Sequence, residues 1–541
     1  MKRYLYIILV ALFAVSCSNS LNGDMPEADY ASVSLSSSTV VVASEMQVKS
    51  IFVASNREEL SVESSQDWVD ISIEGGALRL YVEENTLPTS RLAVVDVTAG
   101  TEPDVAKARV KILQQGAHED NLSKAGTANC YIAKSGASYR FDASVKGNGK
   151  GDGNSQYIAK YGVELKGGAY AMLVWESTFD GDKTRSTKII ADEPIYNAET
   201  GEIHFTTGEM EGNASVALCS AEGDILWSWH IWVTNAEIGT SPSKNLMWLD
   251  RNIGALSNEV GDIANRGVLY QWGRKDPFLP SYVEYMSIPR HKYDEEYNLL
   301  ESEEEYNAVQ AEIIRVRGIV NQSNTQSGDG ALRWNYVGYE APVALNAPGN
   351  IEYAVQHPTT VLSCRTDIAI GEYVFDWYLM QDLQGAGGVM QQSQSLLWGD
   401  ATMGSDYKSI FDPCPVGYAV PPRGAFGVLS EGYACTYVAR EWELAEYGWT
   451  WAGGNGDYFP SSGNLDVSGL IGETGEKILY WTAENFGAGA QGFGKSAMLF
   501  EAYNDVYYGI YPILDPAEAG AWYSYGARCF AAPVRCVKES K

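Results

Sequence analysis

The sequence has few groups that bind metals or nucleic acids. Histidine occurs only five times, at widely separated positions, and the eight cysteines include no C-x-x-C pair. The sequence therefore has few residues that could form a zinc site or a thioredoxin-like site, and we expect no metal and no cofactor. Lys and Arg total 39 against 69 Asp and Glu, a formal charge of −30. Nucleic acid is excluded as a partner, because phosphate binding needs a basic face.

Recognisable catalytic motifs are also missing. We find no G-x-S-x-G nucleophile motif, and no cysteine has a nearby histidine that would activate a thiolate. Sequence spacing nominates no pair of glycosidase carboxylates among so many acidic residues. We therefore expect no enzyme. An accessory to glycan degradation, or an unrecognised glycan-degrading enzyme, stays open as an alternative.

The first residues form a lipoprotein signal. Met1-Lys2-Arg3 precedes an apolar run from Tyr4 to Val15, and Ser16-Cys17 follows. The run is too short to cross a bilayer as a mature helix. We predict that residues 1–16 are a signal peptide, that Cys17 carries a lipid and that residues 17–32 are a flexible tether. An ordinary secretory signal with an incidental cysteine is the alternative.

Localisation follows from the same region. Acidic residues after Cys17 (Asp24, Glu27 and Asp29) resemble the outward-sorting signals of lipoproteins in the Bacteroides group. No later stretch is long and apolar enough to span a membrane. We expect a lipid-anchored protein of the outer membrane that faces the exterior and contacts the membrane through its N-terminal lipid only.

The composition favours a mainly β fold. The counts of 54 Gly, 34 Tyr and 15 Trp are typical of short strands joined by turns. Residues 33–116 alternate strongly, and we predict strands at 40–42, 48–53, 68–73, 78–82, 92–97 and 108–113. Turn signals such as Glu74-Gly75-Gly76 separate them. This spacing predicts a two-sheet sandwich with Trp68 as a core aromatic.

Residues 33–116 also resemble the BACON domain, an immunoglobulin-like module of Bacteroides-group proteins. The resemblance rests on Asp67-Trp68-Val69, Gly76 to Leu80, Glu84-Asn85, Arg91 and Val110 to Gly116. It implies an immunoglobulin-like sandwich that either binds carbohydrate or serves as a spacer.

Residues 117–235 form a second, β-rich unit that ends in a hairpin. Ser215 to Cys219 leads through Ala221-Glu222-Gly223-Asp224 into a strand from Ile225 to Val233. Both faces of that strand carry aromatic residues, so we expect it to be buried on both sides or to face another domain. His230 on this strand is predicted to be a core histidine and not a catalytic base.

Residues 236–541 are predicted to be an α+β domain, with helical spacing in residues 293–318. Several of its phrases resemble the major paralogous domain first noted in Fibrobacter, which occurs in surface lipoproteins and fimbrillin-like proteins. The most specific are Asp412-Pro413-Cys414-Pro415 and Val534-Arg535-Cys536. They imply a Cys414–Cys536 disulfide, which in the chain-entropy model stabilises the fold by closing a long loop. A more distant resemblance is to C-type lectin-like folds. Without Cys17, seven cysteines remain (8 − 1), so at least one thiol is free or bridges to another chain.

The abundance of aromatic residues favours binding. Trp and Tyr rings stack on sugar C–H faces, and we nominate four tryptophans on predicted loops as the carbohydrate site: Trp449, Trp451, Trp334 and Trp398. The predicted function is non-catalytic binding of glycans or mucin. The competing hypothesis is a fimbrial or structural subunit that assembles with surface-complex partners by strand exchange.

Overall fold

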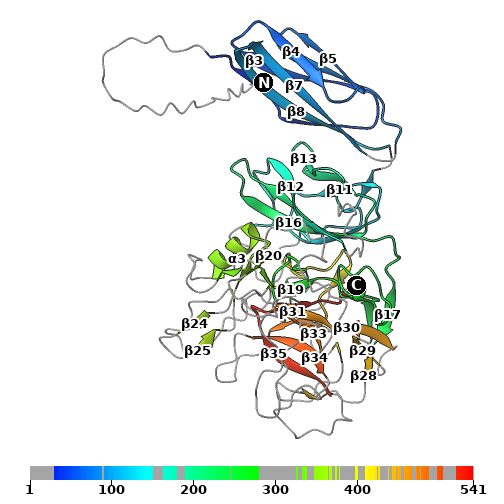
Figure 1. Cartoon of the computed structure of the whole chain (residues 1–541). Coiled ribbons are helices and arrows are strands. Elements are labelled where there is room, and N and C mark those ends of the chain that lie inside the picture. The colour runs from blue at the N-terminus through cyan, green and yellow to red at the C-terminus, as the bar shows by residue number, and fades with distance from the viewer. Residues whose placement is uncertain are drawn as a thin grey trace, which may run out of the picture. The chain divides into compact units, whose positions relative to one another are not determined.

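The structure is a computed structural model of the whole chain (Figure 1). It describes residues 30–87, 90–117, 119–149, 162–178, 189–243 and 245–279. From 324 onward it describes the segments 324–326, 332–334, 336–337, 347–362, 365–367, 372–374, 377, 397–399, 408–422, 425–426, 436–437, 442–445, 447–451, 456–465, 471–474, 477–485, 496–503 and 520–539. The predicted signal peptide, Cys17 and the predicted tether as far as residue 29 lie outside these residues.

The fold is mainly β, as the composition predicts. Its contacts divide the chain into two compact units. The first comprises Met1–Thr39, Val48–Val82 and Ala93–Lys111, and the second comprises Val40–Gln47, Glu83–Leu92 and Ile112–Lys541. Each unit is built from antiparallel sheets, with parallel pairing in a few places.

Residues 33–114 form two four-stranded sheets. One has the order β1 (Val33–Leu35), β3 (Gln47–Ser55), β6 (Ala77–Val82) and β5 (Val69–Glu74). The other has the order β2 (Thr39–Val42), β8 (Asp104–Gln114), β7 (Arg91–Thr101) and β4 (Leu60–Ser64). The six predicted strands are all present, while β1 and β4 were not predicted. Gly75 and Gly76 make the β5–β6 turn with φ of 60° and 79°, which glycine adopts without strain.

The core of these sheets is aliphatic and not aromatic. Alternate residues of β6 and β7 are buried, among them Leu78, Leu80, Val95 and Val97. Trp68 lies in the turn just before β5 and is only half-buried. The prediction of Trp68 as a core residue was therefore wrong, because the inward-facing position at this end of β5 is the adjacent Val69, which is 3% exposed.

Residues 120–233 form two further four-stranded sheets. The first has the order β10 (Cys130–Ala133), β16 (Ile225–Val233), β15 (Gly212–Cys219) and β12 (Tyr170–Ser177). The second has the order β13 (Ile195–Asn197), β14 (Glu202–Thr206), β11 (Ser138–Asp142) and β9 (Asp120–Asn121). The predicted hairpin is confirmed: β15 and β16 pair antiparallel from Gly212↔Val233 to Cys219↔Ile225.

The remaining strands fall into several small sheets. One four-stranded sheet has the order β17 (Thr240–Ser243), β18 (Leu246–Leu249), β37 (Val537–Lys538) and β26 (Tyr418–Ala419). Another has the order β19 (Leu269–Gln271), β36 (Ala531–Pro533), β31 (Ser462–Leu465) and β32 (Ile471–Thr474). A further one has the order β27 (Thr436–Tyr437), β35 (Gly520–Ala527), β34 (Ser496–Tyr503) and β33 (Lys477–Asn485). A three-stranded sheet contains β28 (Trp442–Ala445), β29 (Gly448–Trp451) and β30 (Asp457–Pro460). The two-stranded pairs are β20 (Asn324–Gln326) with β21 (Leu332–Trp334), β22 (Tyr336–Val337) with β23 (Val361–Leu362), and β24 (Arg365–Asp367) with β25 (Glu372–Val374).

Helices are few in the described segments. They comprise the single turn η1 (Ile263–Asn265) and α3 (Ala347–Gln356). The helix predicted within residues 293–318 lies outside the described residues. The α+β description of residues 236–541 therefore rests on α3, and the likeness to C-type lectin folds stays a prediction.

The boundary predicted between residues 235 and 236 does not separate two cores. One cluster of buried residues runs from Cys130 to Cys536. Every residue of β16 from Trp227 to Val233 is buried, as its aromatic residues on both faces predict. Segments from beyond residue 235 supply the cover: Trp232 Nε1 donates to the Ala255 carbonyl at 3.1 Å, and Asn213 Nδ2 donates to the Gly254 carbonyl at 2.9 Å. A strand buried on both faces needs this second layer.

Candidate functional site

Trp227, on β16, is held rigidly by hydrogen bonds that reach far along the chain. Its Nε1 donates to Asn129 Oδ1 at 2.9 Å. The Asn129 amide nitrogen in turn donates to the carbonyls of Ile410 (2.7 Å) and Asp412 (2.8 Å). Lys275 Nζ lies 4.5 Å from the centre of the Trp227 ring, a cation–π distance. Because the ring is only 1% exposed and its indole N–H is used internally, Trp227 offers a ligand little surface, and that surface is apolar.

Helix α3 is fixed opposite the start of β16 by a buried arginine. Arg274, only 2% exposed, donates to the carbonyls of Ala354 (3.3 Å), His357 (3.2 Å) and Thr360 (2.6 Å). Carbonyls at the C-terminal end of a helix have no partner within the helix, and a cation satisfies them well. The helix is therefore oriented so that residues four apart, such as Ile351 and Val355, face one side.

Between β16 and α3 lies a cavity of about 160 Å³. Its apolar lining consists of Ile225, Leu226, Trp227, Ile351, Val355, Ile410 and Phe411, and Lys146, Gly162, Glu352 and Gln356 complete it. We call this cavity the β16–α3 groove. Glu352 is exposed, while Lys146 and Gln356 are half-buried. The groove thus combines an apolar floor with a cation, a carboxylate and an amide.

The glycine-rich segment after residue 145 brings Lys146 to this groove. Gly147 has a φ of 49°, and a Cβ there would collide with the Ile410 carbonyl. Only glycine permits this close approach. Asn148 Nδ2 donates to the Lys408 carbonyl at 2.8 Å, and Lys146 Nζ donates to the Gly162 carbonyl at 3.1 Å. Burial lowers the pKa of Lys146, and the nearby Glu352 charge acts in the opposite direction.

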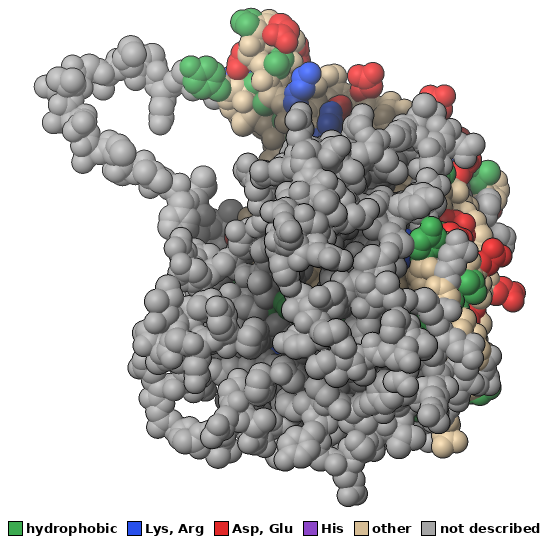
Figure 2. All heavy atoms as spheres, turned by 60° about the horizontal axis from the view of Figure 1, so that its bottom comes forward, with side chains coloured by type: hydrophobic (Ala, Val, Ile, Leu, Met, Phe, Trp, Pro, Cys, Tyr) green, Lys and Arg blue, Asp and Glu red, His purple; other side chains and the backbone are tan. Residues whose placement is uncertain are grey.

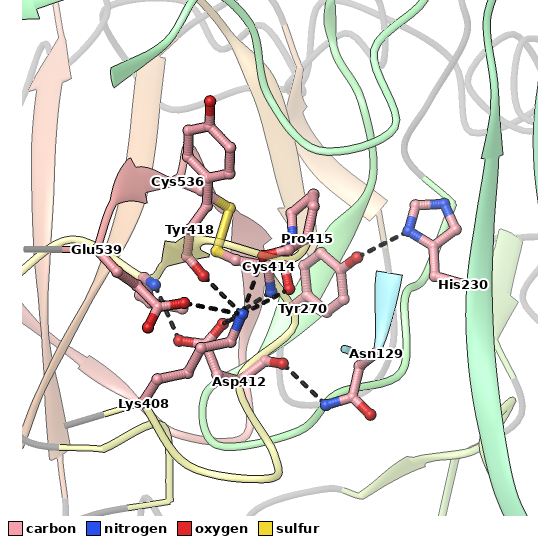
Figure 3. Close-up of a disulfide and its surroundings, with 11 residues drawn as sticks. Asn129, His230, Tyr270, Lys408, Asp412, Cys414, Pro415, Tyr418, Cys536 and Glu539 are labelled. Carbon is pink, nitrogen blue, oxygen red and sulfur yellow. Dashed lines mark hydrogen bonds and ion pairs between the residues drawn. A yellow bond between two sulfur atoms is a disulfide. The ribbon is translucent and has the colours of Figure 1, made fainter. Parts of the chain in front are cut away.

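The segment that carries Ile410 and Phe411 is fastened by a buried ammonium group (Figure 3). Lys408 Nζ donates to the carbonyls of Cys414 (3.0 Å), Pro415 (3.0 Å) and Tyr418 (2.6 Å). It lies 4.0 Å from Asp412 Oδ1 and 3.7 Å from Glu539 Oε1. One side chain therefore closes the loop 408–418 and ties it to the C-terminal segment.

Asp412 organises the same loop from within. Its two carboxylate oxygens accept hydrogen bonds from the backbone N–H of Cys414 (2.8 Å) and of Val420 (3.0 Å). Burial raises the pKa of Asp412 to about 6, against the lowering effect of the Lys408 charge and of these two N–H groups. The Asp-Pro-Cys-Pro phrase thus specifies a buried turn.

The predicted disulfide is confirmed. Cys414 and Cys536 are joined across a sequence separation of 122 residues, with Cα atoms 6.0 Å apart (Figure 3). Cys529 is also disulfide-bonded. Cys130 and Cys219 are free and buried, so the expectation of at least one free thiol holds.

His230 is a core histidine, as predicted. It is 1% exposed, its Nε2 lies 2.8 Å from Asn213 Oδ1, and its Nδ1 lies 3.2 Å from the Tyr270 hydroxyl. Burial lowers its pKa to about 3. The ring is therefore neutral near pH 7, and the partners of its two nitrogens among the described residues are an amide and a hydroxyl.

This environment predicts how His230 titrates. We expect its ring resonances to stay constant between about pH 8 and pH 5, whereas a histidine in the urea-unfolded chain titrates near pH 6.5. Since the folded-state pKa is depressed, His230 costs stability as the pH falls from about 6.5 towards 3. Proton NMR of the folded protein, assigned with His230→Gln, measures this. A ring that titrates near 6.5 in the folded state contradicts the prediction.

The four tryptophans nominated from the sequence do not form a sugar-binding platform. Trp449 and Trp451 lie on β29 and are both 0% exposed. Trp451 packs edge-on against Trp248, with ring centres 5.9 Å apart, in a small core that also holds Phe426 and Phe459. Trp398 is likewise 0% exposed, and its Nε1 donates to the Arg274 carbonyl at 3.0 Å. The prediction for these three residues was wrong, because their rings are consumed by packing. Trp334 ends β21, and its side chain lies outside the described residues.

Metal and membrane elements are sparse in what the structure describes. In the described segments no group of three or more His, Cys, Asp or Glu side chains is placed to hold a metal ion. No helix among those segments has the length and apolar character needed to cross a membrane.

Comparisons with known proteins add little beyond this. No family model and no curated protein matches the sequence. Among solved structures, the chain is similar to a protein from Bacteroides thetaiotaomicron (20% identity, 18% of this chain and 97% of that one, TM-score 0.14). It is also similar to the titin Ig tandem domains A164-A165 (14% identity, 38% of this chain and 96% of that one, TM-score 0.13). A similarity of the same kind is to the D00-D0 domain of intimin (11% identity, 37% of this chain and 96% of that one, TM-score 0.14). These scores are too low to support a functional argument.

Proposed function

We propose that this chain is a non-catalytic, lipid-anchored protein of the outer membrane that faces the exterior and binds glycans or mucin. The observation that carries the proposal is the β16–α3 groove, in which an apolar floor meets a cation, a carboxylate and an amide. Sugars present the same combination, with apolar C–H faces and hydroxyl edges. Ligand sites generally pair apolar walls with a few placed polar groups.

The anchor and the surface location are supported by the sequence alone. Cys17 follows the apolar signal and would carry the lipid. The resemblance of residues 33–116 to BACON domains supports a sandwich that acts as a spacer or as a second glycan contact. Figure 2 shows Asp and Glu side chains on the face drawn, in keeping with the charge of −30. This charge disfavours contact of the folded part with anionic lipid.

The pairing of strand β37 argues against a fimbrial subunit that donates this strand to a partner. Strand exchange needs a terminal strand that can leave its own sheet. Strand β37 lies between β18 and β26, directly after the disulfide-bonded Cys536, and the next residue, Glu539, lies 3.7 Å from Lys408. This strand already completes its own sheet. A donor strand would therefore have to come from elsewhere in the chain.

The proposal predicts that a bulky side chain in the groove abolishes glycan binding. Gln356 is half-buried at the end of α3, and in Gln356→Trp the indole would fill most of a 160 Å³ cavity. We expect at least a tenfold loss of affinity for purified mucin or for the best ligand of a glycan array, measured by biolayer interferometry.

The matched control is His357→Trp. His357 is the next residue, is exposed, stacks on Tyr353 at 4.0 Å between ring centres and does not line the groove. We expect this variant to bind like the wild type. Binding that survives Gln356→Trp, or a wild-type protein that binds no glycan, contradicts the proposal. Sugar release from a glycan panel would favour the enzyme alternative.

A further inference from the structure

We propose that the β16–α3 groove takes the acetamido group of an uncharged N-acetylhexosamine at the end of a glycan chain. This inference rests on the proposed function and specifies its ligand. It is carried by three features of the groove: its size, the chemistry of its lining and the charge around it.

Size limits the part of a ligand that the groove encloses to a single ring or less. The cavity measures about 160 Å³. An engineered cavity of about 150 Å³ holds one benzene molecule, whereas sites for drug-sized ligands measure about 300–1,000 Å³. An internal segment of a polysaccharide would need an open cleft of several such volumes. The groove therefore fits the terminal residue of a chain, or one substituent of it.

The lining selects an apolar substituent. Five aliphatic residues line the floor and walls (Ile225, Leu226, Ile351, Val355 and Ile410), together with the rings of Trp227 and Phe411. A plain hexose would bring hydroxyl groups against this surface, and burial of a hydroxyl without a partner is unfavourable. An acetyl methyl has no such cost, and its burial is favourable. The floor therefore favours an N-acetyl group over a hydroxyl.

The polar residues of the groove suit the amide of that group. Glu352 offers a carboxylate that can accept the acetamido N–H, and Gln356 offers both a donor and an acceptor. The Lys146 ammonium supplies a positive charge on the same cavity, where a carbonyl oxygen is favoured. One N–H and one C=O are all that an acetamido group presents.

Charge argues for a neutral sugar. The chain carries a formal charge of −30, and the groove contributes one cation and one carboxylate. The electrostatic interaction of Lys146 with Glu352 leaves little net positive charge for an anionic ligand. The net negative charge of the chain would thus repel a carboxylated sugar at long range. In the groove, the charge of its carboxylate would be only weakly neutralised.

The test uses the full chain without its signal peptide. Saturation-transfer NMR and competition titrations compare N-acetylglucosamine and N-acetylgalactosamine with glucose, galactose and N-acetylneuraminic acid. We expect at least one N-acetylhexosamine to bind about tenfold or more tightly than its parent hexose, with the strongest saturation at the acetyl methyl. N-acetylneuraminic acid, which carries the same acetamido group and a carboxylate, should bind more weakly.

Two variants locate the contact. Glu352→Leu removes the acceptor from an exposed position and should lower the N-acetylhexosamine affinity about tenfold, since a hydrogen bond to a charged group contributes about 1.5–3 kcal/mol. Glu222→Leu, an exposed residue of the β15–β16 turn outside the groove, should have no effect.

The outcomes separate the two proposals. If glycans bind and Gln356→Trp abolishes binding, but the acetamido group confers no preference, the present inference is wrong and the proposed function stands. Equal or tighter binding of N-acetylneuraminic acid also overturns it. If no glycan binds, both fail.

Discussion

Replacement of Lys408 with methionine is expected to lower the free energy of unfolding of the second unit by about 3–5 kcal/mol. That is the usual cost of removing one partner from a buried charged network. Methionine keeps most of the side-chain volume but no hydrogen-bond donor. Three backbone carbonyls, those of Cys414, Pro415 and Tyr418, would lose their shared donor.

The substitution also removes the positive charge that faces two acidic side chains, Asp412 and Glu539. Asp412 is fully buried, and Glu539 lies 3.7 Å from the ammonium. Without the cation, Asp412 would stay protonated to higher pH, because the Lys408 charge is the main influence that lowers its pKa. Ile410 and Phe411 lie in this loop and line the groove. The affinity of the groove for its ligand should therefore fall together with the stability.

Urea unfolding followed by tryptophan fluorescence measures the effect. Residues 33–116 contain only Trp68 of the 15 tryptophans, so the signal reports mainly on the second unit. The matched control is Lys124→Met at an exposed position of the same unit, where we expect a change within about 0.5 kcal/mol. Equal unfolding midpoints for the two variants would show that the Lys408 network contributes little.

Removal of the Cys414–Cys536 disulfide has an expected effect of similar size. Since the bond closes a loop across 122 residues, the chain-entropy model assigns it about 5 kcal/mol. We expect the double variant Cys414→Ala/Cys536→Ala to unfold at markedly lower urea concentration. Strand β37 should be the first element released, because it follows Cys536 directly.

Hydrogen exchange with mass spectrometry tests the local part of this prediction. Protection should fall first in β37 and in β26, its partner at Ala419↔Val537. Cys219→Ala, which removes a free buried thiol, is the control, and it should cost only about 1 kcal/mol. A double variant that matches this control in urea midpoint and in exchange would mean that the native contacts, not the bond, hold the C-terminal segment.

Local sequence patterns predicted the strands well. Alternation and Gly-rich turns located β2, β3 and β5 to β8, and the hairpin of β15 and β16 was predicted to within three residues. These patterns work because a strand half-buried on a sheet shows its environment in every second residue. β1 and β4 were not predicted, since their three and five residues contain too few alternations of apolar and polar side chains.

The candidate site was not predictable in the same way. The groove combines the start of β16, one side of α3, Lys146 and the Ile410–Phe411 pair, which are distant in the sequence. The local signal was the glycine-rich segment after Lys146, because Gly147 allows a close approach to the Ile410 carbonyl. Helix α3 was missed because Pro348 and Gly349 at its start resemble a loop.

Tryptophan was the most misleading residue type. Trp449, Thr450 and Trp451 precede a glycine pair and look like an exposed loop, yet they form a strand whose rings pack into a core with Trp248. Composition records that a chain has large aromatic rings. Whether a ring faces solvent depends on which distant segments cover it.

By itself the sequence determined the β class, most strands of residues 33–116, the β15–β16 hairpin, the acidic character and, through a family resemblance, the disulfide partner. Each of these is set by side chains near one another in the chain or by composition. Only the tertiary structure decided that one core runs from Cys130 to Cys536 beside a smaller core around Trp248, that Trp449, Trp451 and Trp398 are buried, and where the groove lies. The physical reason is that burial and cavity shape arise from contacts between segments up to several hundred residues apart, as in the hydrogen bond from Asn129 to Asp412, and no local pattern records such contacts.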